Sequence, residues 1–281
     1  MTARILWICF LLSGEFVMAQ KNFTNSIGME FLWVEPGEIV MGEFQPPYPV
    51  PADTVKSLPH DYIMWMGDGR GYNEEEFRLA KETALNDAKE GFSVVVEKPY
   101  YIATTEVTQE QWKKVMGYNP SHFKGADGAD SLPVENVSWK EAQKFIKKLN
   151  RLENVTTYRL PSEVEWEHAA RAGAKKDISW TEIQAVANLN KEMPIAVASN
   201  KPNAWGLYDM LGNVWEWVHD YYNEELFADP EPPKKGRQHV LKGASFSGDV
   251  KNATYMTHAG GPGNGWDVGF RVLKDVEMGS K

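Results

Sequence analysis

The stretch Asn203-Ala-Trp-Gly-Leu-Tyr-Asp-Met-Leu-Gly-Asn-Val-Trp-Glu-Trp217 carries more information than any other part of this 281-residue chain. It is rich in aromatic residues, and Gly206 and Gly212 allow its backbone to turn sharply. Asp209 and Glu216 add two carboxylates, and calcium needs about six to eight oxygens, which carboxylates and turned-in carbonyls supply. The stretch therefore predicts either a calcium site or two carboxylates that cap neighbouring turns.

Upstream of this stretch, three helices are predicted by capping boxes, in which a hydroxyl residue precedes Gln or Glu by three positions. The boxes begin at Thr108, Ser138 and Ser162. Gly117 and Gly173 are placed to end the first and the third of these helices. Beyond residue 178 the helical periodicity fades, and short aromatic and β-branched runs take over.

Strands are predicted on both sides of these helices. Apolar residues alternate around Pro36-Gly37 and indicate a hairpin within 26–43. Residues 44–92 are interpreted as an insertion, with a proline-rich start and one helix of its own. Further strands are expected at 94–102, and then at 239–246 and 268–273. Few helices early and irregular strands later predict a single α+β domain with little regular structure.

The N-terminus has the features of an export signal: a basic residue, a short apolar run and the small-residue cleavage site Val17-Met18-Ala19. The apolar run is shorter than the roughly 20 residues that span a bilayer, and the alternative is a buried N-terminal strand or helix. We therefore expect a signal peptide at 1–19, a mature domain at 20–281 and a secreted or periplasmic location. Cys9, the single cysteine, would be removed with the signal.

The charge balance restricts the partners. The chain has 30 basic and 39 acidic residues and a net charge of −9. Binding to nucleic acid requires a basic face that neutralises phosphates, so nucleic acid is not an expected partner. No membrane span is expected either, because no later stretch approaches the necessary apolar length.

Motifs of common enzyme classes are incomplete. Gly243-Ala-Ser-Phe-Ser-Gly248 has one residue too many for a serine nucleophile elbow. No two of the six histidines have the one-turn spacing that would direct both rings at one metal from a helix. Nothing in the sequence therefore indicates a standard hydrolase.

The stretch Gly206–Trp217 resembles the hallmark motif of the formylglycine-generating enzymes, also called sulfatase-modifying factors. Other blocks agree in the same order: Asn25–Phe31, Pro36–Glu38, Met41-Gly42, Glu106–Gln109, Leu132–Trp139, Tyr158–Gly173, Lys242–Phe246 and Gly269–Arg271. The resemblance covers most of residues 25–274 outside the insertion. It implies one irregular α+β domain, related to C-type lectins and often stabilised by calcium.

The resemblance also implies a set of calcium ligands. One site would use the side chains of Asp209 and Glu216 and the backbone carbonyls of Gly212 and Val214. A second family site would fall at Asn188, Leu189, Ala198 and Asn200. Because the acidic ligand of that second site is here Ala198, only the first site is expected to bind calcium.

The chain departs from the family at the positions of the catalytic metal. The family's oxidases hold copper between two cysteines, which by register correspond to Ala253 and His258. Thiolates are the ligands that select this soft metal, so copper is not expected here. The resemblance therefore implies a pseudoenzyme more readily than an oxidase.

Two kinds of function remain open. The first is a binding or accessory module for a peptide, an exported protein or a glycan. Its groove would be lined by Trp205, Trp215, Trp217 and Trp266, although each tryptophan is also typical of a core. The second is an oxidoreductase with a different metal centre, or a factor that assists sulfatase maturation. The candidate ligands of such a centre are His239, Asp249, His258 and Asp267.

Overall fold

The computed structural model describes most of the predicted domain. The described residues are 22–41, 91–175, 178, 180–223, 233–248, 253–261 and 263–277. The predicted signal peptide at 1–19, nearly all of the 44–92 insertion with its helix, and Asp249 lie outside them. In the described part of the chain, no helix is both long and apolar enough to cross a membrane.

A five-stranded antiparallel sheet joins the two ends of the described chain. Its order is β1-β2-β5-β11-β6, with β1 at Phe23–Thr24, β2 at Glu30–Val34, β5 at Tyr100–Ala103, β11 at Leu273–Asp275 and β6 at Tyr158–Arg159. Phe31 on β2 and Ile102 on β5 are fully buried beneath the helices. The C-terminal strand β11 therefore lies between strands from much earlier in the sequence.

A second, four-stranded sheet contains the end of the stretch Asn203–Trp217, which we call the fingerprint. Its order is β10-β7-β8-β9, with β10 at Val268–Gly269, β7 at Trp215–Tyr221, β8 at His239–Lys242 and β9 at His258–Gly261. β10 runs parallel to β7, and the other pairs are antiparallel. This sheet confirms strands near 239–246 and 268–273, although both are shorter than predicted.

The hairpin predicted within 26–43 is wrong. β2 already has β1 on one edge and β5 on the other, so it has no free edge for the strand that follows Pro36. That strand, β3 at Gly37–Met41, pairs instead with β4 at Phe92–Val96. The two form a separate two-stranded sheet that flanks the predicted insertion.

The three capping-box helices are confirmed. They are α4 at Gln109–Met116, α5 at Trp139–Leu152 and α6 at Glu163–Arg171, and in each the cap hydroxyl and the third helical residue exchange hydrogen bonds with the backbone. Gly117 ends α4 in a left-handed conformation. Ala172, directly before Gly173, ends α6 in the same way.

One helix was missed. α7 at Trp180–Val186 follows the point at which helical periodicity fades in the sequence. It has only seven residues, which is too short for an apolar stripe to repeat. A short 3-10 helix at Ala129–Ser131 was not predicted either.

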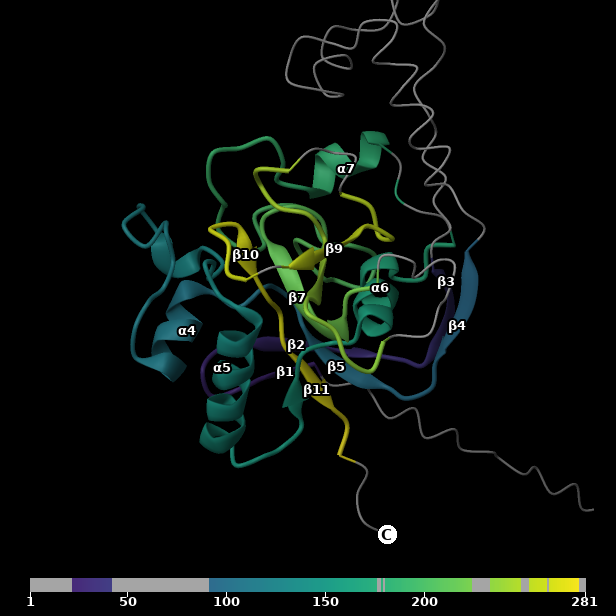
Figure 1. Cartoon of the computed structure of the whole chain (residues 1–281), viewed down its shortest axis with the longest axis horizontal. Coiled ribbons are helices and arrows are strands. Elements are labelled where there is room, and N and C mark those ends of the chain that lie inside the picture. The colour runs from purple at the N-terminus through teal and green to yellow at the C-terminus, as the bar shows by residue number, and fades with distance from the viewer. Residues whose placement is uncertain are drawn as a thin grey trace, which may run out of the picture.

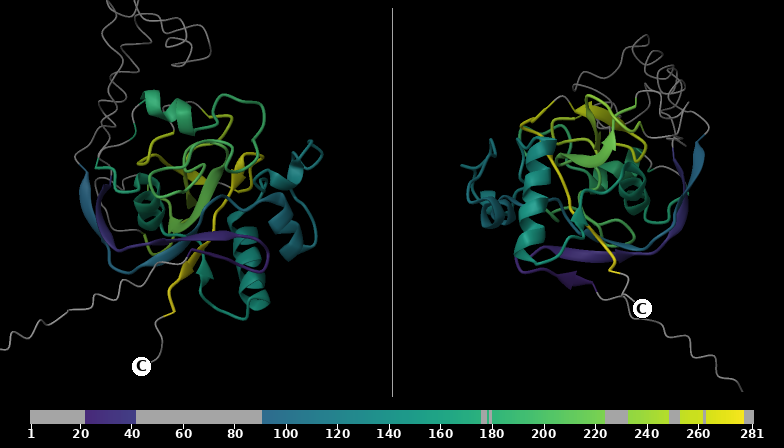
Figure 2. Two further views of the ribbon diagram at one scale, coloured as in Figure 1. Left: turned by 180° about the vertical axis from the view of Figure 1, so that it is seen from behind. Right: turned by 60° about the horizontal axis from the view of Figure 1, so that its bottom comes forward.

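The helices flank the four-stranded sheet from two sides (Figure 1). α4 and α5 lie on one side of β7 and α6 lies on the other, and the views in Figure 2 show the same arrangement. Two apolar cores follow from it: one surrounds α5, with Phe145 and Phe270, and one surrounds α6, with Trp166 and Val218. β7 runs between these cores, so the fingerprint lies at the centre of the domain.

Candidate functional site

Asp209, in the middle of the fingerprint, has an unusual conformation and environment. Its φ is 54°, and its side chain is almost completely buried. One oxygen, Oδ2, accepts a hydrogen bond of 2.7 Å from the Ala198 amide. The other, Oδ1, has no hydrogen-bond partner among the described residues. Burial raises the pKa of this carboxyl, and Asp209 thus keeps one oxygen that no described residue satisfies.

Glu216, on β7, differs from Asp209 because both of its carboxylate oxygens accept hydrogen bonds. Arg271 donates to both of its oxygens, from Nη2 to Oε1 at 2.6 Å and from Nε to Oε2 at 2.7 Å. Trp166 donates from Nε1 to Oε2 at 2.8 Å. This bidentate, charge-assisted pair is completely buried.

The predicted calcium ligands can be tested against these contacts. Asp209 fits, because Oδ1 is free. Gly212 makes a close approach to Asn188, since a Cβ on Gly212 would lie 2.6 Å from the Asn188 carbonyl oxygen. Glu216 accepts from Arg271 and Trp166, and its Oε1 accepts only one of these hydrogen bonds. The calcium ligand set Asp209, Gly212, Val214 and Glu216 therefore stays a prediction.

The second family calcium site lies next to the first. The Ala198 amide is the donor to Asp209, which shows that the two loops touch. The side-chain nitrogens of Asn188 and Asn200 are buried and have no partner in the described structure. In that same part of the chain, no group of three or more His, Cys, Asp or Glu side chains is placed to hold a metal ion.

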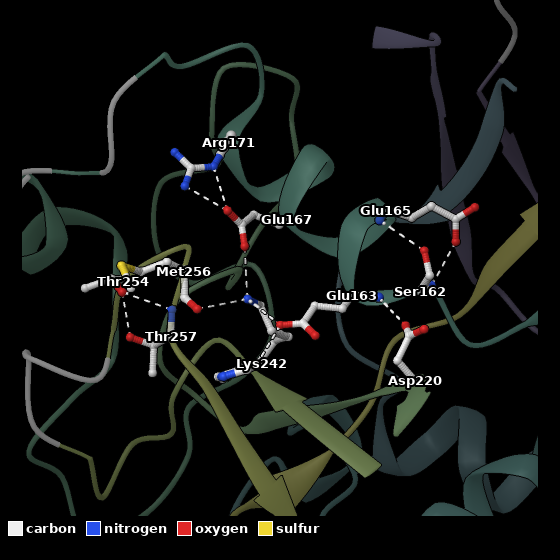
Figure 3. A network of polar contacts seen from close by, with 11 residues as sticks. Ser162, Glu163, Glu165, Glu167, Arg171, Asp220, Lys242, Thr254, Met256 and Thr257 are labelled. Atoms are coloured by element: carbon white, nitrogen blue, oxygen red, sulfur yellow. Dashed lines mark hydrogen bonds and ion pairs between the residues drawn. The ribbon is translucent and has the colours of Figure 1, made fainter. Parts of the chain in front are cut away.

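A buried ion-pair network lies beside His258, one of the two positions at which the family's oxidases have a copper-binding cysteine (Figure 3). Lys242 on β8 is completely buried, and its Nζ lies 3.1 Å from Glu167 Oε2 and 3.4 Å from Glu163 Oε1. Arg171 donates to Glu167 at 2.7 and 2.9 Å. Glu163, Glu167 and Arg171 all come from α6, and Trp166 of the same helix is buried in the core.

His258 joins the same network. Its Nδ1 lies 3.0 Å from Glu163 Oε1. Burial alone would raise the pKa of Glu163, but the charge of Lys242 and the hydrogen bond from His258 outweigh it and lower that pKa. Ala253, the other predicted cysteine position, is fully buried in the apolar core around α6. The two positions thus hold a methyl group and an imidazole tied to Glu163.

Of the four residues proposed for a different metal centre, Asp249 lies outside the described part of the chain, and His239, His258 and Asp267 do not form a group that could hold a metal ion. His239 and His258 lie at opposite ends of the β8–β9 pair, since His239 pairs with Gly261 and His258 with Lys242. His239 is stacked on Trp139, with ring centroids 3.7 Å apart. Asp267 accepts hydrogen bonds from the Ser245 and Ser247 hydroxyls, at 2.8 and 3.1 Å.

The four tryptophans predicted to line a groove lie in different environments. Trp217 is a core residue whose Nε1 donates to the Val137 carbonyl at 2.7 Å. Trp205 is half-buried against His168, and Trp215 packs partly into both cores. Trp266 alone of the four is exposed, at 47%. It lies in an aromatic cluster with His122, Phe123 and Phe246, at centroid distances of 6.5, 6.2 and 5.1 Å.

Sequence reasoning missed the charged residues that hold these sites together. Lys242 and Arg271 were recognised only as parts of the blocks Lys242–Phe246 and Gly269–Arg271. Glu106, within Glu106–Gln109, is completely buried and was not considered for a site either. The available signal was a charged residue inside an otherwise apolar strand sequence, which indicates a buried partner.

Comparisons with known proteins show which family this sequence is similar to. A family model described as "Sulfatase-modifying factor enzyme 1-like domain" matches residues 18–276. "Chaperone protein LppX" of Paenibacillus barcinonensis is 28% identical over 260 residues, which cover 71% of this chain and 89% of that protein. The formylglycine-generating enzyme of Mus musculus is 31% identical over 163 residues, and the match spans less than half of either protein, 48% of this chain and 42% of the enzyme.

The fold is also present in solved structures. Treponema denticola variable protein 1 superposes with a TM-score of 0.68 at 25% identity, over 92% of this chain and 99% of that chain. The irregular arrangement of short sheets around β7 is therefore an established fold.

Proposed function

The chain belongs to the sulfatase-modifying factor enzyme 1-like domain family, and on that basis we propose that it is an exported binding or accessory module without the family's cysteine-oxidising activity. Its partner would be a peptide or another exported protein, and the protein would act in the periplasm or outside the cell. The match over residues 18–276 covers nearly the whole chain, so the proposal concerns the domain as a unit.

One observation carries the proposal: Ala253 and His258, which correspond to the family's two copper-binding cysteines, supply no sulfur. Ala253 has no ligand atom in its side chain, and it is fully buried. His258 has one ring nitrogen engaged with Glu163. A soft copper ion is selected by thiolates, and this pair cannot replace them. The residues at this position do not fit the family's oxygen-activating centre.

The binding half of the proposal is supported by the aromatic cluster of His122, Phe123, Phe246 and Trp266. Large aromatic side chains that are rigid and partly exposed are the residues that most often dominate binding energy at protein interfaces. Trp266 and His122 are exposed, Phe123 is half-buried and Phe246 is buried, so the cluster reaches the surface from three loops. The relative named as a chaperone, which this chain matches over most of both lengths, is consistent with a protein partner.

The proposed lack of cysteine-oxidising activity can be tested directly. The full chain, loaded with copper, should not convert the cysteine of a sulfatase-derived peptide to an aldehyde above the level of copper alone. The measurement is mass spectrometry of the peptide, with a formylglycine-generating enzyme as the positive control. An aldehyde that forms with the wild type and disappears with His258→Ala would contradict the proposal and favour an enzyme that uses the His258–Glu163 pair for proton transfer.

The binding half predicts that Trp266→Ala weakens partner binding by at least about tenfold, because truncating a central tryptophan removes a large apolar contact. Peptides selected from a displayed library on the wild type would be measured by titration against both variants. Leu152→Ala is the matched control, since Leu152 is 56% exposed at the end of α5 and outside the aromatic cluster. Equal affinity for wild type and Trp266→Ala, or selection of glycans alone on an array, would rule out this surface for a peptide.

A further inference from the structure

Arg171, the last residue of α6, is a buried arginine with unused hydrogen-bond donors. A guanidinium has five N–H groups. Two of them, on Nε and Nη2, donate to Glu167 Oε1 at 2.9 and 2.7 Å. Nη1 has no hydrogen-bond partner in the part of the chain that the structure describes, and in Figure 3 the third guanidinium nitrogen points away from Glu167. The edge formed by Nη1 and Nη2 therefore lacks an acceptor among the described residues.

Arg271 shows that this protein can satisfy a buried guanidinium completely. Its side chain is as deeply buried as that of Arg171, and it donates two hydrogen bonds to Glu216. Three more go to the backbone carbonyls of Ala103, Thr104 and Tyr208. A buried donor without an acceptor has lost its hydration without compensation, which is unfavourable. A ligand oxygen at the free edge of Arg171 would supply that compensation.

Arg171 also forms part of the wall of a cavity of about 490 Å³, between the end of α6, α7 and the 201–211 loop. Volumes of about 300–1,000 Å³ are typical of small-molecule sites. Glu182 and Lys201 belong to the exposed part of the wall, so the cavity opens to solvent. Apart from Arg171 and Asp209, the buried part consists of apolar and aromatic residues: Ala170, Ala172, Leu207, Met210, Leu211 and Tyr255.

The guanidinium of Arg171 is held in place before any ligand binds. Glu167 accepts from one edge, and the Tyr255 ring lies against the group, with its centroid 5.5 Å from Cζ. Because the free edge is already fixed, a ligand would lose little affinity to the ordering of this side chain. Glu167 also accepts from Lys242 at 3.1 Å, so its charge is divided between two cations.

A carboxylate is the group that matches this edge. Its two oxygens fit two parallel N–H groups of a guanidinium, and such charge-assisted pairs are stronger than neutral hydrogen bonds. The wall carries two basic residues, Arg171 and Lys201, and two acidic ones, Asp209 and Glu182, so its charge does not exclude an anion. The rest of a ligand would contact the apolar interior, which favours a hydrocarbon chain or apolar side chains.

We propose that this cavity binds an apolar molecule that ends in a carboxylate. The carboxylate accepts from the Nη1–Nη2 edge of Arg171, and the apolar part packs on Leu207, Met210 and Leu211. A free fatty acid and the C-terminus of a peptide with apolar last residues share this chemistry. The aromatic cluster of His122, Phe123, Phe246 and Trp266 does not contribute to the wall, so this site is separate from the surface proposed above for a partner.

Calorimetric titration of the full chain with octanoate and with octanol tests the proposal, because the two probes share a chain and differ in the carboxylate. The wild type should bind octanoate with a Kd of about 0.1 mM or lower and octanol at least about tenfold more weakly. Arg171→Lys should lose this discrimination, since an ammonium paired with Glu167 does not offer two parallel N–H groups. Arg159→Lys is the control, because Arg159 is outside the wall, and it should leave both affinities unchanged.

Ala185→Phe is the second variant, for the case that Arg171→Lys does not fold. Ala185 is an exposed residue of α7 on the wall, so phenylalanine should fill the cavity and abolish binding of both probes while the melting temperature stays close to that of the wild type. Ala126→Phe, outside the wall, is its control and should bind as the wild type does. Retained octanoate binding in Ala185→Phe would overturn the proposal.

A peptide that ends in Leu-Leu, with a free or an amidated C-terminus, identifies the source of the carboxylate. Binding of the free-acid peptide, with at least about tenfold weaker binding of the amide, would assign the site to a peptide C-terminus. Binding of octanoate without the peptide would assign it to a fatty acid. A wild type that binds neither octanoate nor the free-acid peptide, or that binds each no better than its uncharged counterpart, would overturn the proposal.

Discussion

Replacing Arg271 with Gln is expected to lower the free energy of unfolding by at least about 3–5 kcal/mol, because it removes one partner of a completely buried ion pair. Glu216 would keep only the hydrogen bond from Trp166, and its charge would stay in the core. Domains of this kind have a total stability of about 5–15 kcal/mol, so much of the margin would be lost. Denaturant unfolding followed by tryptophan fluorescence measures the change.

Arg159→Gln is the control for this prediction. Arg159 makes an equally short bidentate contact with Glu165, at 2.6 and 2.7 Å, but its side chain is 34% exposed. Water can replace its partner, so we expect a loss near 1 kcal/mol or less. Arg271→Lys should fall between the two, since it keeps the charge without the five-donor geometry. Similar losses for Arg271→Gln and Arg159→Gln would show that burial does not set the cost.

Local signals explain which parts of the fold the sequence predicts. The capping boxes at Thr108, Ser138 and Ser162 are formed by residues three positions apart, so they can be recognised without tertiary information. The hairpin within 26–43 failed because strand pairing depends on which edges other strands have already taken. β5 and β1 cover β2, and both pairings join segments that no local pattern connects.

The candidate sites depend on pairs that are distant in the sequence. Lys242 and Glu167 are 75 positions apart, and Arg271 and Glu216 are 55 apart. The motifs showed that these charged residues belong to apolar segments, but not which ones meet. Trp217 illustrates the reverse case: its aromatic character suggested a groove, whereas its ring packs on Gly261 inside the domain.

Trp166 links the two buried polar groups. Its Nε1 donates to Glu216, which binds Arg271. The Lys242 ammonium lies over the same indole ring, 5.6 Å from its centroid. α6 thus connects the fingerprint to the ion pairs of Lys242. A change in either the Arg271–Glu216 pair or the Lys242 pairs alters the environment of Trp166, which contacts both.

Lys242→Met should also lower the free energy of unfolding by about 3–5 kcal/mol, because it leaves Glu163 and Glu167 buried with fewer partners. Met fills a similar volume, so the loss reports mainly on charge. Lys274→Met is the control: Lys274 lies 3.8 Å from the exposed Glu277, a type of pair that contributes little. A loss below about 1 kcal/mol in Lys242→Met would contradict a structural role for the network.

The pH dependence of the same variant separates charge from packing. In the wild type the pKa of Glu163 is lowered below 4.5, so its contribution is complete above that pH and is lost as the pH falls through the folded-state value. Without Lys242, burial becomes the dominant influence and should raise that pKa. The variant should therefore gain more stability than the wild type as the pH falls from 7 to about 5, because the other carboxyls with raised pKa values are common to both proteins. Parallel pH profiles for the two proteins would show that Lys242 acts through packing alone.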